Sequence, residues 1–192
     1  NYIKQLKSKI SSGNGGNVVL DGSDDKVLFP SASQLDTLTI NGISVSAWVK
    51  PITTGDSGTG RIAEKRTSGY DGWLFFMDAT NTIGVQVLST TSGNTVFQSR
   101  GADNYIQLSD WNHVVFTYNY NASAPIKLYV NGSEILYSTQ DTNNTNVPSN
   151  DSGATLIIAD SVQSDRSFNG NISSVAIYNK VLTGAEITQN YN

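Results

Sequence analysis

Hydrophobic and polar residues alternate over many short stretches of this chain, most clearly in the segments 111–118 and 126–130. Successive side chains of a β-strand point to opposite faces of the sheet. Val114 and Phe116 therefore share one face of the first segment, while Val115 lies on the other. Because both faces are largely apolar, we expect this strand pair to be covered on both sides, in the middle of two stacked sheets.

Turn signals separate the alternating stretches by roughly eight to twelve residues, a spacing typical of β-sandwiches. Asn131-Gly132 is the strongest of these signals, since both residues tolerate positive φ. The pattern predicts an all-β fold, a two-sheet antiparallel β-sandwich, with a polar exposed loop over 139–152. The other strands are expected at 18–22, 26–30, 43–51, 61–65, 72–77, 83–87, 95–99, 135–137, 155–159 and 172–178.

Two segments favour a helix instead of a strand. Thr183 and Glu186 have the spacing of a capping box, in which each side chain bonds the backbone N–H of the other residue, so a short C-terminal helix is expected. Near the start, Tyr2, Leu6 and Ile10 share one helical face, which predicts a short N-terminal helix or packing arm.

The length of 192 residues is typical of one sandwich domain, and glycines before Val18 predict an arm or linker over 1–17 and a domain over 18–192. Charged residues make up only 15% of the chain and the net charge is −4, so nucleic acid is not expected as a partner. No apolar run is long enough to predict membrane insertion. The absence of cysteine excludes disulfides and thiolate zinc sites.

Several short motifs follow one another along the chain from about Val18 to Asn190. They are Leu20-Asp21-Gly22, Phe29-Pro30, Val45 to Pro51, Glu64-Lys65, Gly72-Trp73, Trp111 to Val114, Leu128 to Gly132, Phe168 to Ile172, Ile177 to Leu182, and Glu186-Ile187. Their order and spacing resemble the laminin-G-like jelly-roll domain of the concanavalin-A-like lectin and glucanase superfamily. The resemblance implies two curved antiparallel sheets, with a concave side and rim loops where ligands commonly bind. It implies the fold more strongly than a function.

The acidic residues do not form a glucanase site. Retaining hydrolysis needs two carboxylates about 5 Å apart on either side of the scissile bond. The chain has only Glu64, Glu134 and Glu186, none with a second Glu within five residues, so we expect no enzymatic activity. His113 is the only histidine and, within a strand, is expected to be a structural residue on a sheet face.

The first Asp-Gly turn is the candidate metal site. Asp21 and Asp24, with Asp25 beside them, supply hard oxygen ligands of the kind that calcium prefers. The resemblance implies one structural calcium ion near this turn, helped by acidic residues on the closing strand. Ser173 and Ser174 occupy those positions here, which removes a carboxylate from the expected ligand set.

Aromatic residues are the usual stacking platforms for sugars. Trp48, Trp73 and Trp111 lie inside the matched motifs, so we expect them to pack in the core. Tyr70 and Asp71 lie on a loop and combine a stacking group with a hydrogen-bonding group, which makes them the candidate ligand-binding residues. Other tyrosines that flank loops are Tyr105, Tyr120 and Tyr137.

These observations favour a non-catalytic recognition or adhesion module that binds carbohydrate or another surface within a larger extracellular or particle-surface assembly. The partner is then a glycan or a surface protein, as for a lectin or cell-adhesion domain. The alternative is a structural protein of a virus capsid, fibre or cell-surface layer, in which the jelly roll and the N-terminal arm make protein contacts. Either hypothesis places the chain outside the cell or on the surface of a cell or virus particle.

Overall fold

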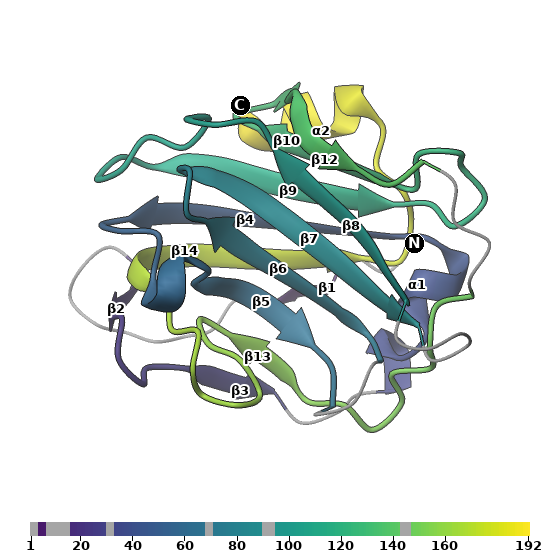
Figure 1. Cartoon of the computed structure of the whole chain (residues 1–192), viewed down its shortest axis with the longest axis horizontal. Coiled ribbons are helices and arrows are strands. Elements are labelled where there is room, and N and C mark those ends of the chain that lie inside the picture. The colour runs from purple at the N-terminus through teal and green to yellow at the C-terminus, as the bar shows by residue number, and fades with distance from the viewer. Residues whose placement is uncertain (1–3, 7–15, 30–32, 68–70, 90–94, 143–146) are drawn as a thin grey trace.

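The computed structural model describes residues 4–6, 16–29, 33–67, 71–89, 95–142 and 147–192, which form two antiparallel β-sheets. In the described residues each sheet has seven strands. Figure 1 shows helix α2 (Gly184–Tyr191) beside β10 at one edge of the molecule, with β3 and β13 at the opposite edge. The predicted two-sheet antiparallel β-sandwich is confirmed.

Sheet A has the strand order β1-β14-β4-β9-β10-β11, and β2 also pairs with β14. The bounds along this sheet are β1 Lys4–Leu6, β14 Asn169–Tyr178, β4 Ile43–Pro51, β9 Asn112–Tyr118, β10 Ile126–Val130, β11 Ser133–Glu134 and β2 Val18–Asp21.

Sheet B has the order β12-β8-β7-β6-β5-β13-β3. Its strands are β12 Tyr137–Gln140, β8 Thr95–Gly101, β7 Thr82–Ser89, β6 Trp73–Asp78, β5 Arg61–Lys65, β13 Leu156–Ile158 and β3 Val27–Phe29. Besides α2, the short helical segments are η1 Ser33–Leu35, α1 Leu38–Asn41 and η2 Asp56–Gly58.

The central strand pair lies where the alternation predicts it. Strand β9 pairs with β4 on one side and β10 on the other. Phe116 points into the core, with its ring centroid 5.2 Å from that of Phe75 and 5.6 Å from that of Trp73. Val115 points to the opposite face, where it is buried against Ile187 of α2. Both faces of β9 are therefore covered, as expected.

Helix α2 begins at the predicted capping box. The Glu186 backbone N–H donates to Thr183 Oγ1 over 3.3 Å, and the Thr183 N–H donates to Glu186 Oε2 over 2.9 Å. Bonds from the Lys180 side chain and from Thr183 lower the pKa of Glu186 to about 2. The helix places the fully buried Ile187 on the outer face of sheet A.

The N-terminal segment is predicted to be a short helix or a packing arm, and its described residues 4–6 do not form a helix. Lys4–Leu6 form strand β1, which pairs with Val175 to Ile177 of β14, while Tyr2 and Ile10 lie outside the described residues. A free edge of sheet A offers backbone hydrogen bonds, and so short a helix is marginal by itself. Tertiary pairing therefore overrides the helical spacing of the side chains.

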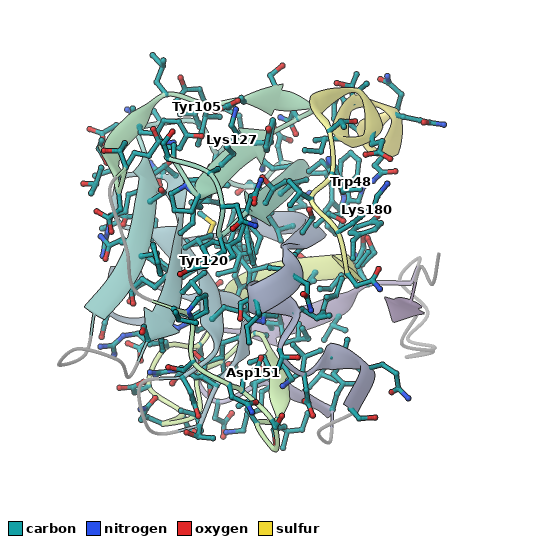
Figure 2. The ribbon with its side chains drawn as sticks, turned by 90° about the vertical axis from the view of Figure 1, so that its right-hand side faces the viewer. Trp48, Tyr105, Tyr120, Lys127, Asp151 and Lys180 are labelled. Carbon is teal, nitrogen blue, oxygen red and sulfur yellow. The ribbon has the colours of Figure 1, made fainter. Side chains whose placement is uncertain are left out.

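The segment 139–152 is less exposed than its polar composition predicts. Its start belongs to β12, which pairs with β8, and Asp151 is completely buried. Asp151 Oδ2 lies 3.3 Å from Nζ of Lys65, whose side chain is only 1% exposed, and Asp36 Oδ1 lies 2.9 Å from the same nitrogen. Burial of Asp151 is thus explained by its pairing with a buried lysine at one end of the core (Figure 2).

None of the described helices is both long and apolar enough to cross a membrane.

Candidate functional site

The two sheets differ in what covers their outer faces. Helix α2 packs on sheet A, but none of the described helices makes extensive contact with the strands of sheet B. Along β5 to β8, the core takes alternate residues such as Phe75, Val85 and Phe97, so the residues between them point outward. We call the polar residues of this outward set, together with Phe76 and Gly84, the polar face; they are Arg61, Glu64, Phe76, Asp78, Gly84, Gln86, Gln98 and Arg100. The outward Leu74 and Leu88 pack with Phe76 in a small buried apolar cluster on the same face.

One row of cross-strand partners runs over four neighbouring strands of the polar face. Arg61 pairs with Phe76, Phe76 with Gly84, and Gly84 with Arg100. A Cβ atom at Gly84 would lie 2.5 Å from Cζ of Phe76. The missing side chain at Gly84 therefore provides the space in which the Phe76 ring lies across β7.

Two arginines lie over that one ring. The guanidinium carbon of Arg61 is 5.4 Å from the Phe76 ring centroid, and that of Arg100 is 5.2 Å from it, both within range of a cation–π interaction. Phe76 itself is only 1% exposed. The ring thus supports the arginines, and a ligand on this face meets their N–H groups instead of an aromatic surface.

Buried acceptors fix the orientation of the arginines. Arg61 donates from Nε to Glu64 Oε2 over 3.1 Å and from a terminal nitrogen to the Thr59 carbonyl over 3.0 Å. Arg100 pairs with Asp78. Burial lowers the pKa of Arg61, and the charge of Glu64 opposes that shift. Both arginines are therefore oriented by fixed partners before any ligand arrives.

A second row of the polar face carries two amides. Gln86 Nε2 donates to Gln98 Oε1 over 2.7 Å, and the Gln98 backbone N–H donates to Asp141 Oδ2 over 2.8 Å. Both glutamine side chains are half-buried. Side-chain amides offer both donors and acceptors, which match the hydroxyl groups of sugars.

Of the two predicted ligand-binding residues, Tyr70 and Asp71, the structure describes only Asp71. Tyr70 lies outside the described residues. Asp71 accepts hydrogen bonds from the Thr67 backbone N–H and hydroxyl, each over 2.7 Å, so its carboxylate closes its own loop. Ligand binding by Tyr70 and Asp71 stays a prediction.

The predicted calcium ligands hold the turn between β2 and β3. Asp21 Oδ1 accepts from the Ser23 N–H over 2.8 Å, and Asp25 Oδ2 accepts from the Asp21 N–H over 2.9 Å, while Asp24 is exposed. In the part of the chain that the structure describes, no three acidic or histidine side chains gather around a common point. Asp21 and Asp25 thus stabilise the turn itself, and calcium binding through Asp21 and Asp24 stays a prediction.

The three tryptophans occupy three different environments. Trp73 is 1% exposed in the core, as expected. Trp111 is 38% exposed, so the prediction of core packing is wrong for it, because it precedes the first residue of β9 and lies outside the strand. Trp48 is half-buried on the outer face of sheet A, where its ring stacks on Tyr191 with centroids 5.7 Å apart (Figure 2). That position is also outside the core.

His113 is a packed side chain of the same face, as predicted. It is 2% exposed, and its ring lies 5.2 Å from that of Trp48. Burial lowers the pKa of His113 to about 4, so the imidazole is neutral near pH 7. Two of the tyrosines considered for sugar stacking also serve the fold, since the hydroxyl of Tyr105 accepts from the Leu136 N–H and that of Tyr137 from the Leu128 N–H.

A small apolar cleft opens between the two sheets near β2, β3, β13 and β14. Its lining includes Leu20, Phe29 and Ile158, with Ser173 and Ser174 at one side. The cleft carries no charged lining residue, and its polar lining side chains are those of Ser173 and Ser174. It marks an edge at which the sandwich is incompletely closed.

A family model described as the concanavalin A-like lectin/glucanases superfamily matches residues 21–188. The chain belongs to this superfamily. The expected laminin-G-like jelly roll is thereby confirmed. No curated protein sequence matches the chain significantly.

Solved structures of known binding domains share the fold. The CBM40 domain of the Ruminococcus gnavus IT-sialidase, bound to α2,3-sialyllactose, has a TM-score of 0.62 and 14% identity, over 92% of this chain and 98% of that one. Domain 4 of AbnA, an arabinanase from Geobacillus stearothermophilus, in complex with arabinotriose, has a TM-score of 0.58 and 20% identity, over 100% and 82%. The heptameric pentraxin of Limulus polyphemus has a TM-score of 0.59 and 16% identity, over 92% and 81%. At these identities the likeness shows the fold alone.

The polar face is not among the sites predicted from the sequence, although its residues carry a signal. The polar positions of the alternating strands include Arg61, Gln86, Gln98 and Arg100. Which of these strands become neighbours depends on the sheet order, and alternation within one strand does not reveal it. The row from Arg61 to Arg100 appears only once the four strands are paired.

Proposed function

We propose that this domain is a non-catalytic glycan-binding module and that the polar face of sheet B is its binding surface. The observation that carries the proposal is the row of oriented arginines and amides on a sheet face that no described helix covers. Binding sites for small molecules combine a shaped surface with a few fixed polar groups, which set orientation and specificity. The polar face has such groups on four adjacent strands.

The superfamily and the solved structures support a binding role. The sialidase CBM40 domain is bound to α2,3-sialyllactose, and the arabinanase domain is in complex with arabinotriose. Both are carbohydrate ligands on domains of the same fold. We extend that chemistry to this chain because its polar face supplies the donors and acceptors that sugar hydroxyls require.

The carboxylates of the polar face support binding without catalysis. Glu64 has a fully buried side chain, within 3.1 Å of Arg61 and 3.4 Å of Arg66, and Asp78 pairs with Arg100. A glycosidase needs one carboxylic acid and one carboxylate that reach the scissile bond. Glu64 and Asp78 orient arginines instead, so we propose no hydrolytic role for them.

Because soluble glycans and glycan-coated surfaces are encountered mainly outside the cell, we place the domain in an extracellular or surface setting. In that setting it would serve as the recognition part of a larger assembly.

One observation favours the second candidate, a structural or adhesive role through protein contacts. Ile52, Leu108 and Trp111 are 55%, 39% and 38% exposed, and the Ser109 N–H donates to the Pro51 carbonyl over 2.7 Å. That bond holds the loop with Leu108 beside the end of β4. If this candidate is correct, the wild-type protein self-associates in analytical ultracentrifugation, and replacing Trp111 and Leu108 by serine abolishes the self-association. A wild-type protein that stays monomeric at high concentration contradicts the structural role.

A glycan array with the wild-type domain, in calcium and in chelator, tests the leading proposal. We expect binding that the double variant Gln86→Ala/Gln98→Ala weakens at least tenfold, because it removes two hydrogen-bonding amides. Lys127→Ala is the matched control, since this half-exposed lysine lies on β10 of sheet A. An array that stays blank under both conditions overturns the proposal.

A further inference from the structure

We propose that the sugar bound by the polar face is acidic and that Arg100 holds its carboxylate, with Arg61 as the second cationic group. This inference rests on the proposed function and names the ligand class of the same site. The argument starts from what the row Arg61, Phe76, Gly84 and Arg100 presents to a ligand.

The accessibility of the two arginines differs in a way that assigns their roles. The Arg100 side chain is 32% exposed, whereas that of Arg61 is 11% exposed. Among the described residues, Asp78 is the hydrogen-bond acceptor of one terminal nitrogen of Arg100, and no described residue accepts from the other N–H groups. Arg100 is therefore the group that can bind a ligand, and the more deeply placed Arg61 adds its charge from the other side of the ring.

Each acidic partner is less exposed than the arginine with which it pairs. The side chains of Glu64 and Asp78 are 0% and 11% exposed, less than that of Arg100. A third guanidinium, Arg66, lies 3.4 Å from Glu64. Asp165, whose side chain is 52% exposed, is a further carboxylate near Arg61 and Arg66, and Asp141 accepts from the Gln98 backbone N–H. In the pair of Arg100 and Asp78 the more exposed side chain is the positive one, although the whole chain carries −4 at pH 7.

The shape of the guanidinium selects the kind of anion. Arginine presents parallel N–H groups in one plane, which match the two oxygens of a carboxylate. The Phe76 ring lies within cation–π range of both guanidinium groups and occupies the space that Gly84 leaves on β7. Neutral sugars need no such cation, so this arrangement is better explained by a sugar that carries a carboxylate.

Titration of the purified domain with soluble glycans tests the inference. The acidic arm uses sialyllactose and oligomers of a uronic acid, the neutral arm uses lactose and arabinotriose, and the third arm uses a sulfated oligosaccharide. We expect a carboxylated glycan to bind at least tenfold more tightly than the neutral ones, and its affinity to fall as salt is added.

Variants assign the binding to Arg100. Arg100→Gln should lose about ten- to hundredfold in affinity for the acidic glycan, and Arg100→Lys should recover only part of it, since the charge is kept but the planar fork is lost. Lys127→Gln removes one charge from sheet A and should leave the affinity unchanged. Circular dichroism and the melting temperature show whether each variant is folded.

The outcomes separate this inference from the proposed function. Neutral glycans that bind as tightly as carboxylated ones, with a dependence on Gln86 and Gln98, overturn the inference and leave glycan binding intact. Preference for the sulfated oligosaccharide, or an affinity for the acidic glycan that Arg100→Gln does not change, also overturns it. A domain that binds none of the glycans overturns the proposed function itself.

Discussion

The ring of Phe76 occupies the space that a side chain at Gly84 would fill, with its Cζ atom 2.5 Å from the position of that missing Cβ. The two residues are direct partners on β6 and β7. This relationship places the ring under the guanidinium groups of Arg61 and Arg100. A single glycine therefore determines how the polar face is built.

Replacing Gly84 with alanine tests this relationship. The added methyl group must displace the Phe76 ring, so we expect the free energy of unfolding to fall by about 1–3 kcal/mol, as for overpacked sites in general. Glycan affinity should fall as well, because the arginines lose their support. Gly184→Ala is the control, since nothing lies within 4 Å of a Cβ there. Equal urea-denaturation midpoints for the two variants would contradict the account.

The buried charge cluster at Lys65 predicts a large loss of stability on substitution. Lys65→Met removes the cation from Asp151 and Asp36, which lie 3.3 Å and 2.9 Å from Nζ, and we expect a loss of about 3–5 kcal/mol. Burial already raises the pKa of Asp151, so the loss should shrink at acidic pH as that carboxylate takes up a proton. Urea denaturation at several pH values measures both effects.

A matched variant distinguishes this cluster from a surface ion pair. Lys127 pairs with Glu134 over 3.0 Å, but the lysine side chain is 49% exposed, so Lys127→Met should cost less than about 1 kcal/mol. If Lys65→Met lowers the free energy of unfolding by no more than Lys127→Met does, the buried cluster stabilises the fold no more than a surface ion pair, which contradicts the prediction.

His113 predicts a pH dependence of stability. Burial lowers the pKa of His113 in the folded state to about 4, below its ordinary value of 6.5, so the unfolded chain binds a proton first as the pH falls. Neutral His113 therefore contributes fully to the free energy of unfolding above pH 6.5. This contribution, at most about 3 kcal/mol, is lost as the pH falls from 6.5 to 4. Subtracting the unfolding profile of His113→Gln from that of the wild type isolates this contribution. A difference that does not change over this pH range rules out the assignment.

Calcium binding at Asp21 and Asp24 is tested by thermal unfolding. Ions that bind the folded state raise its stability by mass action. A bound calcium should raise the melting temperature relative to the chelated protein, and Asp24→Asn should remove the difference while Asp103→Asn, a substitution in a separate loop, should not. Identical melting curves in calcium and after exhaustive chelation would argue against the metal.

Local sequence patterns predict most of the fold. The alternation around Val114 and Phe116, the Asn131-Gly132 turn and the Thr183 and Glu186 capping box each specify a local structure through the spacing of their own side chains. The structure confirms all three. By contrast, strand β1 depends on an edge of β14 far away in the sequence, and its own residues suggest a helix instead.

The binding surface is harder to predict because it depends on neighbours. Asp151 looks like part of an exposed polar loop until its partner Lys65 is known, and Arg100 looks like any outward residue of a strand. What distinguishes Arg100 is the ring of Phe76 beneath it and Asp78 beside it, and both lie on another strand. Residue types alone therefore pointed to tyrosines on loops and not to this face.

The most direct test of the account is to map a bound glycan by NMR, following the backbone and side-chain N–H signals of the domain during titration with the best-binding acidic glycan. The account predicts that the largest shifts occur at Arg100, Gln98 and Gln86, and that they disappear in Arg100→Gln. Shifts concentrated on the outer face of sheet A, around Trp48 and Tyr191, would contradict the assignment of the polar face as the binding surface.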